Sequence, residues 1–214
     1  MNRDKLKEMA YHAMGKRKAH IDRERGFIYY HCGRTAKLAL TLRESLFPDM
    51  ADKDDVIFAG ALFHDVAKGI EPHNERGALL VGDMLKHEVS SSELADIVAI
   101  VRGHNKRKPG DNGIPYFIKL VQDADVLDHF GSAEVWLKVQ YSATHGETMQ
   151  EAAAFWNSES YEAEVRRWRG LLNYELSLRH FDEKTAFVSQ FIHRFTREAE
   201  GELVPVAGSW AGQA

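Results

Sequence analysis

The sequence of 214 residues contains one cysteine, which excludes an intramolecular disulfide framework and a zinc site made of cysteines. It has no stretch near the roughly 20 apolar residues of a membrane span, and Met1–Ala10 lacks the apolar segment of a signal peptide. Its 28 lysines and arginines against 32 aspartates and glutamates give a net charge of −4, which does not indicate a general nucleic-acid or membrane binder. A cytoplasmic protein is therefore expected.

Two groups of catalytic motifs are also missing. There is no glycine-rich phosphate loop and no serine nucleophile elbow, so a kinase, a P-loop NTPase and an α/β-hydrolase have no support. Few stretches resemble strands, and the five prolines fall between helical patterns. The chain is therefore predicted to be all-α and to form a single domain over residues 1–214.

Apolar residues recur at helical spacing through most of the chain. Ser90 and Glu93 are expected to form a capping box, and Asp182 is expected to cap the last helix. Residues 131–160 are less regular, and the Gly/Ala-rich tail from Leu203 is expected to be loosely held. The expected helices are Phe27–Phe47, Asp54–Lys68, Pro72 to about His87, one that follows Ser90, one that Pro115 opens, Tyr161–His180 and Glu183–Glu200.

Histidine is the one residue type with an unusual count, eleven in all. His64 and Asp65 end an almost wholly apolar run that starts at Val56. Adjacent side chains on a helix point about 100° apart, and burying an unpaired carboxylate costs several kcal/mol. A metal bound by both side chains resolves this conflict. The alternative is a helix that ends in solvent and carries an ordinary surface histidine and aspartate.

Further histidines and aspartates lie on other predicted helices. His104 continues the apolar stripe that contains Val101, and Asp125 is in phase with Ile118 and Val121. A single histidine of this kind is often a hydrogen-bonded core residue, but an aspartate on an apolar face asks for a cation. Imidazoles and carboxylates converging from several helices would form an open metal site inside a bundle. In chain order the candidates are His31, His64, Asp65, His73, His104 and Asp125.

Three segments resemble the HD superfamily of metal-dependent phosphohydrolases: His31-Cys-Gly-Arg-Thr-Ala-Lys-Leu-Ala, Ala61-Leu-Phe-His64-Asp65-Val-Ala-Lys68 and Gln122-Asp-Ala-Asp125-Val-Leu-Asp128. The resemblance covers about Tyr29–Phe130. It implies an HD-domain helical bundle with its core at about residues 27–130 and a helical extension at about 131–200. It also implies that His31, His64, Asp65 and Asp125 bind a first metal. Asp123 is the alternative for the last ligand, but helix phase favours Asp125, because Asp123 points about 160° away.

Two resemblances within the superfamily lead to different substrates. His73 and His104 resemble the residues that add a second metal, bridged by Asp65, in enzymes that include symmetrical diadenosine tetraphosphate hydrolases. Asp123-Ala-Asp125-x-x-Asp128, together with Phe191-x-x-x-Phe195-x-x-Glu198, resembles small bacterial HD hydrolases, some of which are nucleotide pyrophosphohydrolases. Val126 departs from the arginine common in many HD proteins. The expected cofactor is one or two divalent ions of Mn, Fe, Ni or Co, with Zn or Mg as further options.

The expected function is hydrolysis of a phosphoester or phosphoanhydride, in a nucleotide or other small phosphorylated substrate, by metal-activated water. Asp65 would orient or deprotonate that water, and Lys68 would stabilise charge on the phosphoryl oxygens. Arg102, Lys106 and Arg107 would attract and bind substrate phosphates. The alternatives are a nucleotide-binding HD module that signals without catalysis and a purely structural bundle. The C-terminal helices either cover the site or form the interface of a homodimer.

Overall fold

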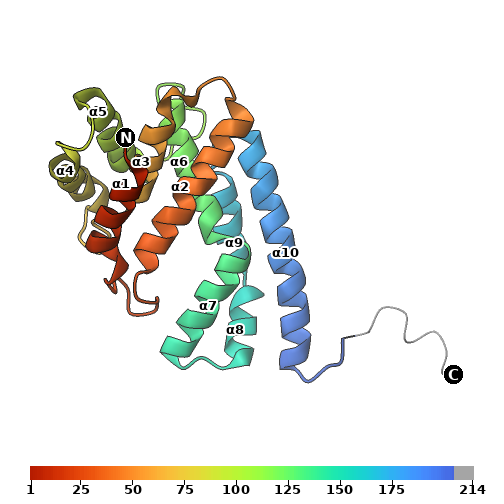
Figure 1. The fold of residues 1–214 in the computed structure, drawn as a ribbon. Coiled ribbons are helices and arrows are strands. Elements are labelled where there is room, and N and C mark those ends of the chain that lie inside the picture. The colour runs from red at the N-terminus through yellow and green to blue at the C-terminus, as the bar shows by residue number, and fades with distance from the viewer. Residues whose placement is uncertain (205–214) are drawn as a thin grey trace.

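The computed structural model describes residues 1–204, and within them it is helical without any strand (Figure 1), which confirms the all-α prediction. The expectation for the tail falls almost entirely outside these residues. The helices are α1 (Arg3–Ala10), α2 (Phe27–Leu46), α3 (Asp54–Phe63), α4 (His73–Leu85), α5 (Ser91–Gly103), α6 (Tyr116–His129), α7 (Ser132–His145), α8 (Met149–Trp156), α9 (Glu159–Arg169) and α10 (Glu175–Ala199), with a π-helical turn η1 (Tyr11–Gly15) and a 3₁₀ turn η2 (Ala51–Lys53).

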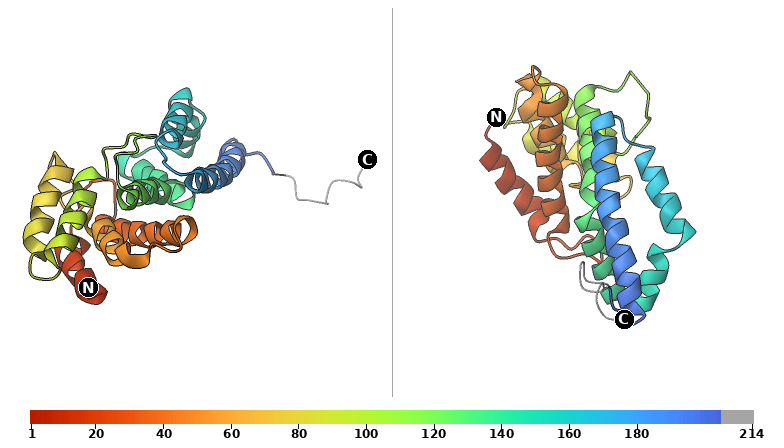
Figure 2. Two further views of the ribbon diagram at one scale, coloured as in Figure 1. Left: turned by 90° about the horizontal axis from the view of Figure 1, so that it is seen from above. Right: turned by 90° about the vertical axis from the view of Figure 1, so that its right-hand side faces the viewer.

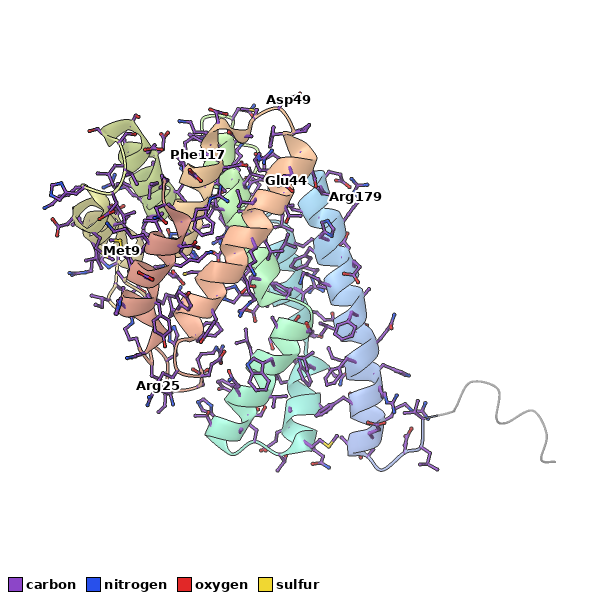
Figure 3. All side chains as sticks on the ribbon, in the orientation of Figure 1. Met9, Arg25, Glu44, Asp49, Phe117 and Arg179 are labelled. Carbon is purple, nitrogen blue, oxygen red and sulfur yellow. The ribbon has the colours of Figure 1, made fainter. Side chains whose placement is uncertain are left out.

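The helices pack in two groups that share α6 (Figure 2). In the first group α2 lies against α3 and α6, α3 lies against α5, and α5 pairs with α4. In the second group α10 runs along α6, α7 and α8. One hydrophobic core extends from Leu6 on α1 to Phe181 on α10. Polar side chains such as Glu44 on α2 and Arg179 on α10 point outward (Figure 3). No helix within residues 1–204 has both the length and the apolar character that crossing a membrane requires.

The helix that leads to the His-Asp pair is shorter than predicted. α3 ends at Phe63, and residues 64–69 form tight turns in which Val66 N–H bonds to Phe63 O at 3.0 Å and Lys68 N–H to Asp65 O at 2.9 Å. Arg17 donates to the carbonyls of Val66 and Lys68, each at 2.9 Å. This distant guanidinium thus holds the turns that follow α3, and both members of the pair lie in the first of these turns.

The predicted boundary between the last two helices, which placed Asp182 at the start of the last one, is wrong. Asp182 lies inside α10, where it binds Arg169 at 2.7 Å, and the break between α9 and α10 falls earlier, at residues 170–174. The N–H groups of Asn173 and Tyr174 donate to the carboxylate of Asp123 on α6, at 2.9 and 3.1 Å. A carboxylate on another helix therefore holds the loop that leads into α10. In contrast, the capping box of Ser90 and Glu93 is confirmed at the start of α5.

The contact between α3 and α5 generates a stability prediction. A Cβ on Gly60 would lie 2.5 Å from Cδ1 and 2.8 Å from Cβ of Ile100. We expect Gly60→Ala to lower the free energy of unfolding by about 1–3 kcal/mol through overpacking, measured by denaturant unfolding. Gly33→Ala is the matched control, because no atom lies within 4 Å of its added Cβ, and it should gain up to about 1 kcal/mol of helix propensity. Equal stabilisation by both would contradict the close approach.

Candidate metal centre

The six side chains proposed as ligands from the sequence converge on one buried place in the structure. They come from five segments of the chain, so no two neighbouring helices suffice to build the cluster. His31 lies on α2, His64 and Asp65 in the turn after α3, His73 at the start of α4, His104 at the end of α5 and Asp125 on α6.

The first group of atoms surrounds the Nε2 atoms of His31 and His64, which are 3.2 Å apart. Oδ1 of Asp125 lies 3.2 Å from Nε2 of His31 and 3.6 Å from Nε2 of His64. Oδ2 of Asp65 lies 3.9 Å from Nε2 of His64. Two imidazoles and two carboxylates thus approach one point with the atoms that bind metals.

The second group of atoms uses the other oxygen of Asp65. Its Oδ1 lies 3.3 Å from Nε2 of His73 and 3.4 Å from Nε2 of His104, and the two nitrogens are 3.3 Å apart. This buried oxygen has no partner with hydrogen-bond geometry among residues 1–204. Asp65 therefore presents one oxygen to each histidine pair.

The histidine tautomers favour metal binding through Nε2. Nδ1 of His64 lies 2.7 Å from the carbonyl of Ala61, and Nδ1 of His104 lies 2.7 Å from the carbonyl of Val101. A carbonyl cannot donate a hydrogen bond, so Nδ1 carries the proton in both rings. Once a cation replaces any proton on Nε2, each ring would be neutral and would direct its Nε2 lone pair at the centre, as histidine ligands with an outer hydrogen bond do.

These spacings fit a bound cation. Ligand bonds of about 2.1 Å place neighbouring donor atoms roughly 3.0–3.4 Å apart in octahedral or tetrahedral geometry. Both Nε2–Nε2 separations and three of the four Nε2–Oδ1 separations, at 3.2–3.4 Å, fall in this range, while that from His64 to Asp125 is 3.6 Å. The mixed imidazole and carboxylate set suits Mn, Fe, Ni, Co or Zn. The unpartnered oxygen of Asp65 would gain its missing interaction in this way.

Without a cation, protons balance the buried carboxylates. Burial lowers the pKa of His31, but hydrogen bonds to Asp125 and Asp128 outweigh it and raise that pKa to about 9. Burial acts to raise the pKa of Asp125, yet the hydrogen bonds from His31 and His64 hold it well below its usual value. The centre therefore keeps its carboxylates ionised and attracts positive charge.

Two residues outside the predicted site position His31. Nδ1 of His31 donates to Oδ2 of Asp128 at 2.7 Å. Arg34 donates to both oxygens of Asp128, at 2.8 and 2.9 Å. Burial would raise the pKa of Asp128, but the bonds from His31 and Arg34 lower it to about 2. The spacings of three residues from His31 to Arg34 and from Asp125 to Asp128 are the sequence signals that could have identified them.

His129 is a further residue that the sequence reasoning missed. Its Nδ1 lies 2.9 Å from the backbone oxygen of Asp125, one helical turn earlier, and its ring centroid lies 4.5 Å from that of His31. His31, Asp125 and His129 offer ligand atoms within 4.8 Å of one another. Burial lowers the pKa of His129, and the neighbouring His31 adds to the effect. The spacing of four residues from Asp125 could have revealed it.

The predicted basic residues fall into two sets. Lys68 places Nζ 3.2 Å from Oδ2 of Asp65, and Arg107 forms an ion pair with Oδ2 of Asp125. Arg102 and Lys106 instead bind the exposed Glu75, and neither lines the cavity at the centre. Asp123, the alternative ligand, faces away from the centre, because its carboxylate accepts hydrogen bonds from Asn173 and Tyr174 in the loop before α10.

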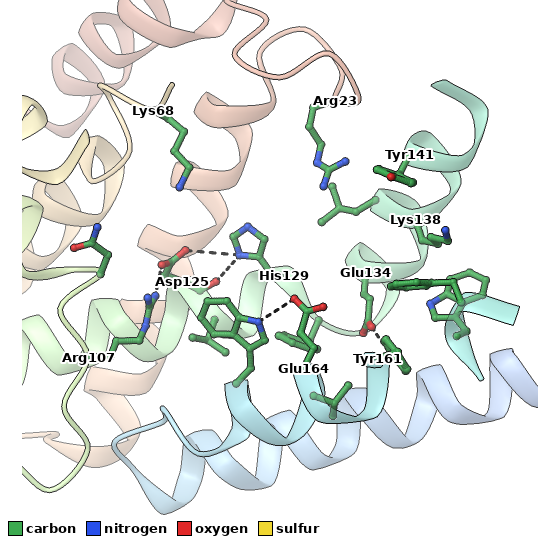
Figure 4. Close-up of a pocket in the computed structure, with 18 of the residues that line it drawn as sticks. Arg23, Lys68, Arg107, Asp125, His129, Glu134, Lys138, Tyr141, Tyr161 and Glu164 are labelled. Atoms are coloured by element: carbon green, nitrogen blue, oxygen red, sulfur yellow. Dashed lines mark hydrogen bonds and ion pairs between the residues drawn. The ribbon is translucent and has the colours of Figure 1, made fainter. Parts of the chain in front are cut away.

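A cavity of about 710 Å³ opens beside the centre (Figure 4). His73, His104, Asp125 and His129 line one part of it, with Lys68 and Arg107 beside them. The cavity then continues between α7, α8 and α9. A molecule in this space would meet the polar centre at one end and a largely aromatic wall at the other.

The contact of His31 with Asp128 predicts a loss of metal affinity. The carboxylate of Asp128 orients His31 and increases the basicity of its imidazole. Asp128→Ala removes this carboxylate, so Mn²⁺ or Co²⁺ should bind about 10–100-fold more weakly. Isothermal titration calorimetry would measure the dissociation constant. Asp83→Ala is a matched control, since this exposed carboxylate on α4 binds only Lys86. An unchanged affinity in Asp128→Ala would contradict the positioning role.

The raised pKa of His31 predicts a pH dependence. Its proton stabilises the metal-free fold fully below its ordinary pKa of 6.5, and this contribution disappears as the pH rises through about 9. A metal must displace the proton, so affinity should rise with pH up to about 9, by roughly tenfold per unit for each proton displaced. Co²⁺ titrations between pH 6.5 and 9 would test this, and a flat profile would be inconsistent with a protonated metal-free centre.

Comparison with known proteins confirms the resemblance seen in the sequence. Residues 28–129 match the family model for the HD domain, whereas a search of curated proteins found no match. The fold is similar to an HD-superfamily hydrolase of Bacillus thuringiensis, with a TM-score of 0.70 and 23% identity over 94% of this chain and 97% of that one.

Other solved structures share the fold at lower identity. Bacillus subtilis YpgQ in complex with ADP gives a TM-score of 0.64 and 17% identity, over 92% of this chain and 97% of that one. A predicted HD superfamily hydrolase from an uncultured Thermotogales bacterium gives 0.59 and 18%, over 91% of each chain. At these identities the likeness shows the fold alone. The chain therefore carries an HD domain at residues 28–129 and shares its fold with HD-superfamily hydrolases.

Proposed function

We propose that the protein is a metal-dependent phosphohydrolase that acts on a nucleotide or a similar small phosphorylated substrate. The observation that carries this proposal is the carboxylate of Asp65, which presents one oxygen to His64 and the other to His73 and His104. His31 and Asp125 complete the first group of ligands. A carboxylate shared in this way supports two ions rather than one.

Divalent cations held by these side chains would lower the pKa of water toward neutrality and neutralise charge on phosphate oxygens. Asp65 is ionised, because the nearby His64, His104 and Lys68 together outweigh the burial that would raise its pKa. It can therefore orient a water molecule by accepting its hydrogen bond. Lys68 lies beside it on the wall of the cavity, where its ammonium group can contact a phosphoryl oxygen.

Arg107 would serve both the centre and the substrate. It pairs with one oxygen of Asp125, which leaves the other oxygen directed at His31 and His64. It also lines the cavity, so its guanidinium can meet a phosphate group there. The exposed Arg102 and Lys106 would at most attract an anion from solution, because Glu75 already binds both.

Two observations support a nucleotide as substrate. The cavity of about 710 Å³ is within the usual range for small-molecule sites. YpgQ, which has a similar fold, was crystallised in complex with ADP. The complete set of histidines and aspartates favours catalysis over a module that only binds a nucleotide.

Removal of a proposed metal ligand tests the proposal. We expect His64→Ala or Asp65→Ala to reduce phosphate release from nucleotides by at least about a thousandfold, because metal assistance contributes several kcal/mol to the transition state. Elemental analysis should show less metal per chain, and circular dichroism should show nearly unchanged helix content. His180→Ala, at an exposed position of α10, is the control. A fully active His64→Ala or Asp65→Ala protein would refute the site.

A further inference from the structure

The part of the cavity beyond the metal centre has a distinct composition. Six aromatic residues line it, and all of them follow residue 129, where the match to the HD family model ends. They are contributed by the end of α6 and by α7, α8 and α9. These residues are Phe130, Tyr141, Phe155, Trp156, Tyr161 and Trp168.

This aromatic wall is continuous with the centre. Arg107 pairs with Asp125 and also places Cζ 5.4 Å from the ring centroid of Trp168. Tyr141 and Phe155 are 38% and 39% exposed, although large aromatic side chains are normally packed away from water. Nζ of Lys138 lies over both rings, 5.0 Å from the centroid of Tyr141 and 4.4 Å from that of Phe155. A ligand that extends from the centre past Arg107 would therefore meet aromatic side chains that are partly exposed.

Polar groups at the same wall narrow the chemistry of that ligand. Tyr161 donates to the carboxylate of Glu134 at 2.6 Å, and both residues line the cavity. Trp156 keeps its buried Nε1–H without a hydrogen-bond partner among residues 1–204. Oε2 of Glu134 is likewise buried without a hydrogen-bond partner among these residues. An alkyl chain would leave this oxygen and the Nε1–H of Trp156 unpaired, and a sugar alone would make little use of six aromatic rings. A planar heterocycle with polar edges matches both features.

We propose that the wall formed by α7, α8 and α9 binds the nucleobase of the substrate, with Trp168 and Phe155 as contact surfaces and Glu134 and Tyr161 at the polar edge. This inference rests on the proposed function, because it assigns the phosphates to the metal centre. Base–aromatic contacts tolerate different bases, since each base has a π face. Burial raises the pKa of Glu134 to about 7, so near neutral pH its carboxyl can either accept or donate a hydrogen bond.

A comparison of two substrates with and without a base tests the assignment. On the metal-loaded full chain, Trp168→Leu should lower kcat/KM for ATP by at least about tenfold, the usual effect of losing one stacking contact. The kcat/KM of Trp168→Leu for inorganic tripolyphosphate should stay within about threefold of the wild-type value. Trp136→Leu is the matched control, because this tryptophan lies on α7 outside the cavity and is 55% exposed. It should leave both substrates unaffected.

Phe155→Leu provides a second variant from a different helix, in case Trp168→Leu fails to fold by circular dichroism. It should show the same selective loss for ATP. Equal losses for both substrates, or a wild-type protein that prefers tripolyphosphate, would overturn the assignment.

A binding measurement separates this inference from the proposed function. Adenosine, guanosine, cytidine and uridine carry no phosphate, so calorimetric titration of the metal-free chain reports the aromatic wall alone. At least one nucleoside should bind to the wild-type chain, and its dissociation constant for Trp168→Leu should be about tenfold higher. If the metal-loaded protein hydrolyses neither polyphosphate, the proposed function fails, while nucleoside binding would still uphold the wall. If no nucleoside binds, or if decyl phosphate binds better than every nucleotide, the nucleobase assignment is wrong.

Discussion

The burial of two carboxylates, Asp65 and Asp125, is the constraint on which the rest of this structure depends. Both lie in a bundle whose other interior residues are mostly apolar, and an ion in such surroundings is stable only when opposite charge and hydrogen bonds compensate it. The raised pKa of His31 shows how strongly the place attracts positive charge when protons alone supply it. A pair of divalent cations would satisfy the same demand with fixed geometry.

The surrounding fold places four of the six candidate ligands at or just beyond the ends of helices. His64 and His104 follow the last residues of α3 and α5, and His73 begins α4. Helix ends leave carbonyl groups without intrahelical partners, and side chains from distant segments satisfy them here. Asn74 donates to the carbonyl of Arg102 at 2.8 Å, and Gln122 donates to that of Gly103 at 2.9 Å. These two bonds close the end of α5, and they thereby hold His104, which follows it.

The positions that the sequence could predict were those with a local signal. Asp125 shares a helical phase with buried residues, and the apolar run before His64 indicates that His64 and Asp65 are buried. All three side chains lie at the centre in the structure. The turns after α3 and the loop before α10, in contrast, are held by Arg17 and Asp123, which are remote in the chain. No window of sequence contains such a pair. For the same reason Asp128 was recognised only as a neighbour of Asp125, not as the partner of His31.

The same distinction explains why the sequence left the substrate undecided. The ligands that imply phosphate chemistry lie within residues 28–129, where the family model matches. The aromatic residues beside them come from helices that the family model does not cover, and residues 131–160 carried too little periodicity to place them in advance. Arg107 connects the two regions, since it contacts Asp125 on one side and Trp168 on the other. Under the proposed function, a change in the C-terminal helices can therefore alter which phosphorylated compound fits without moving any of the proposed metal ligands. The packing of α7, α8 and α9 against α6 is then the part of the structure that determines the substrate.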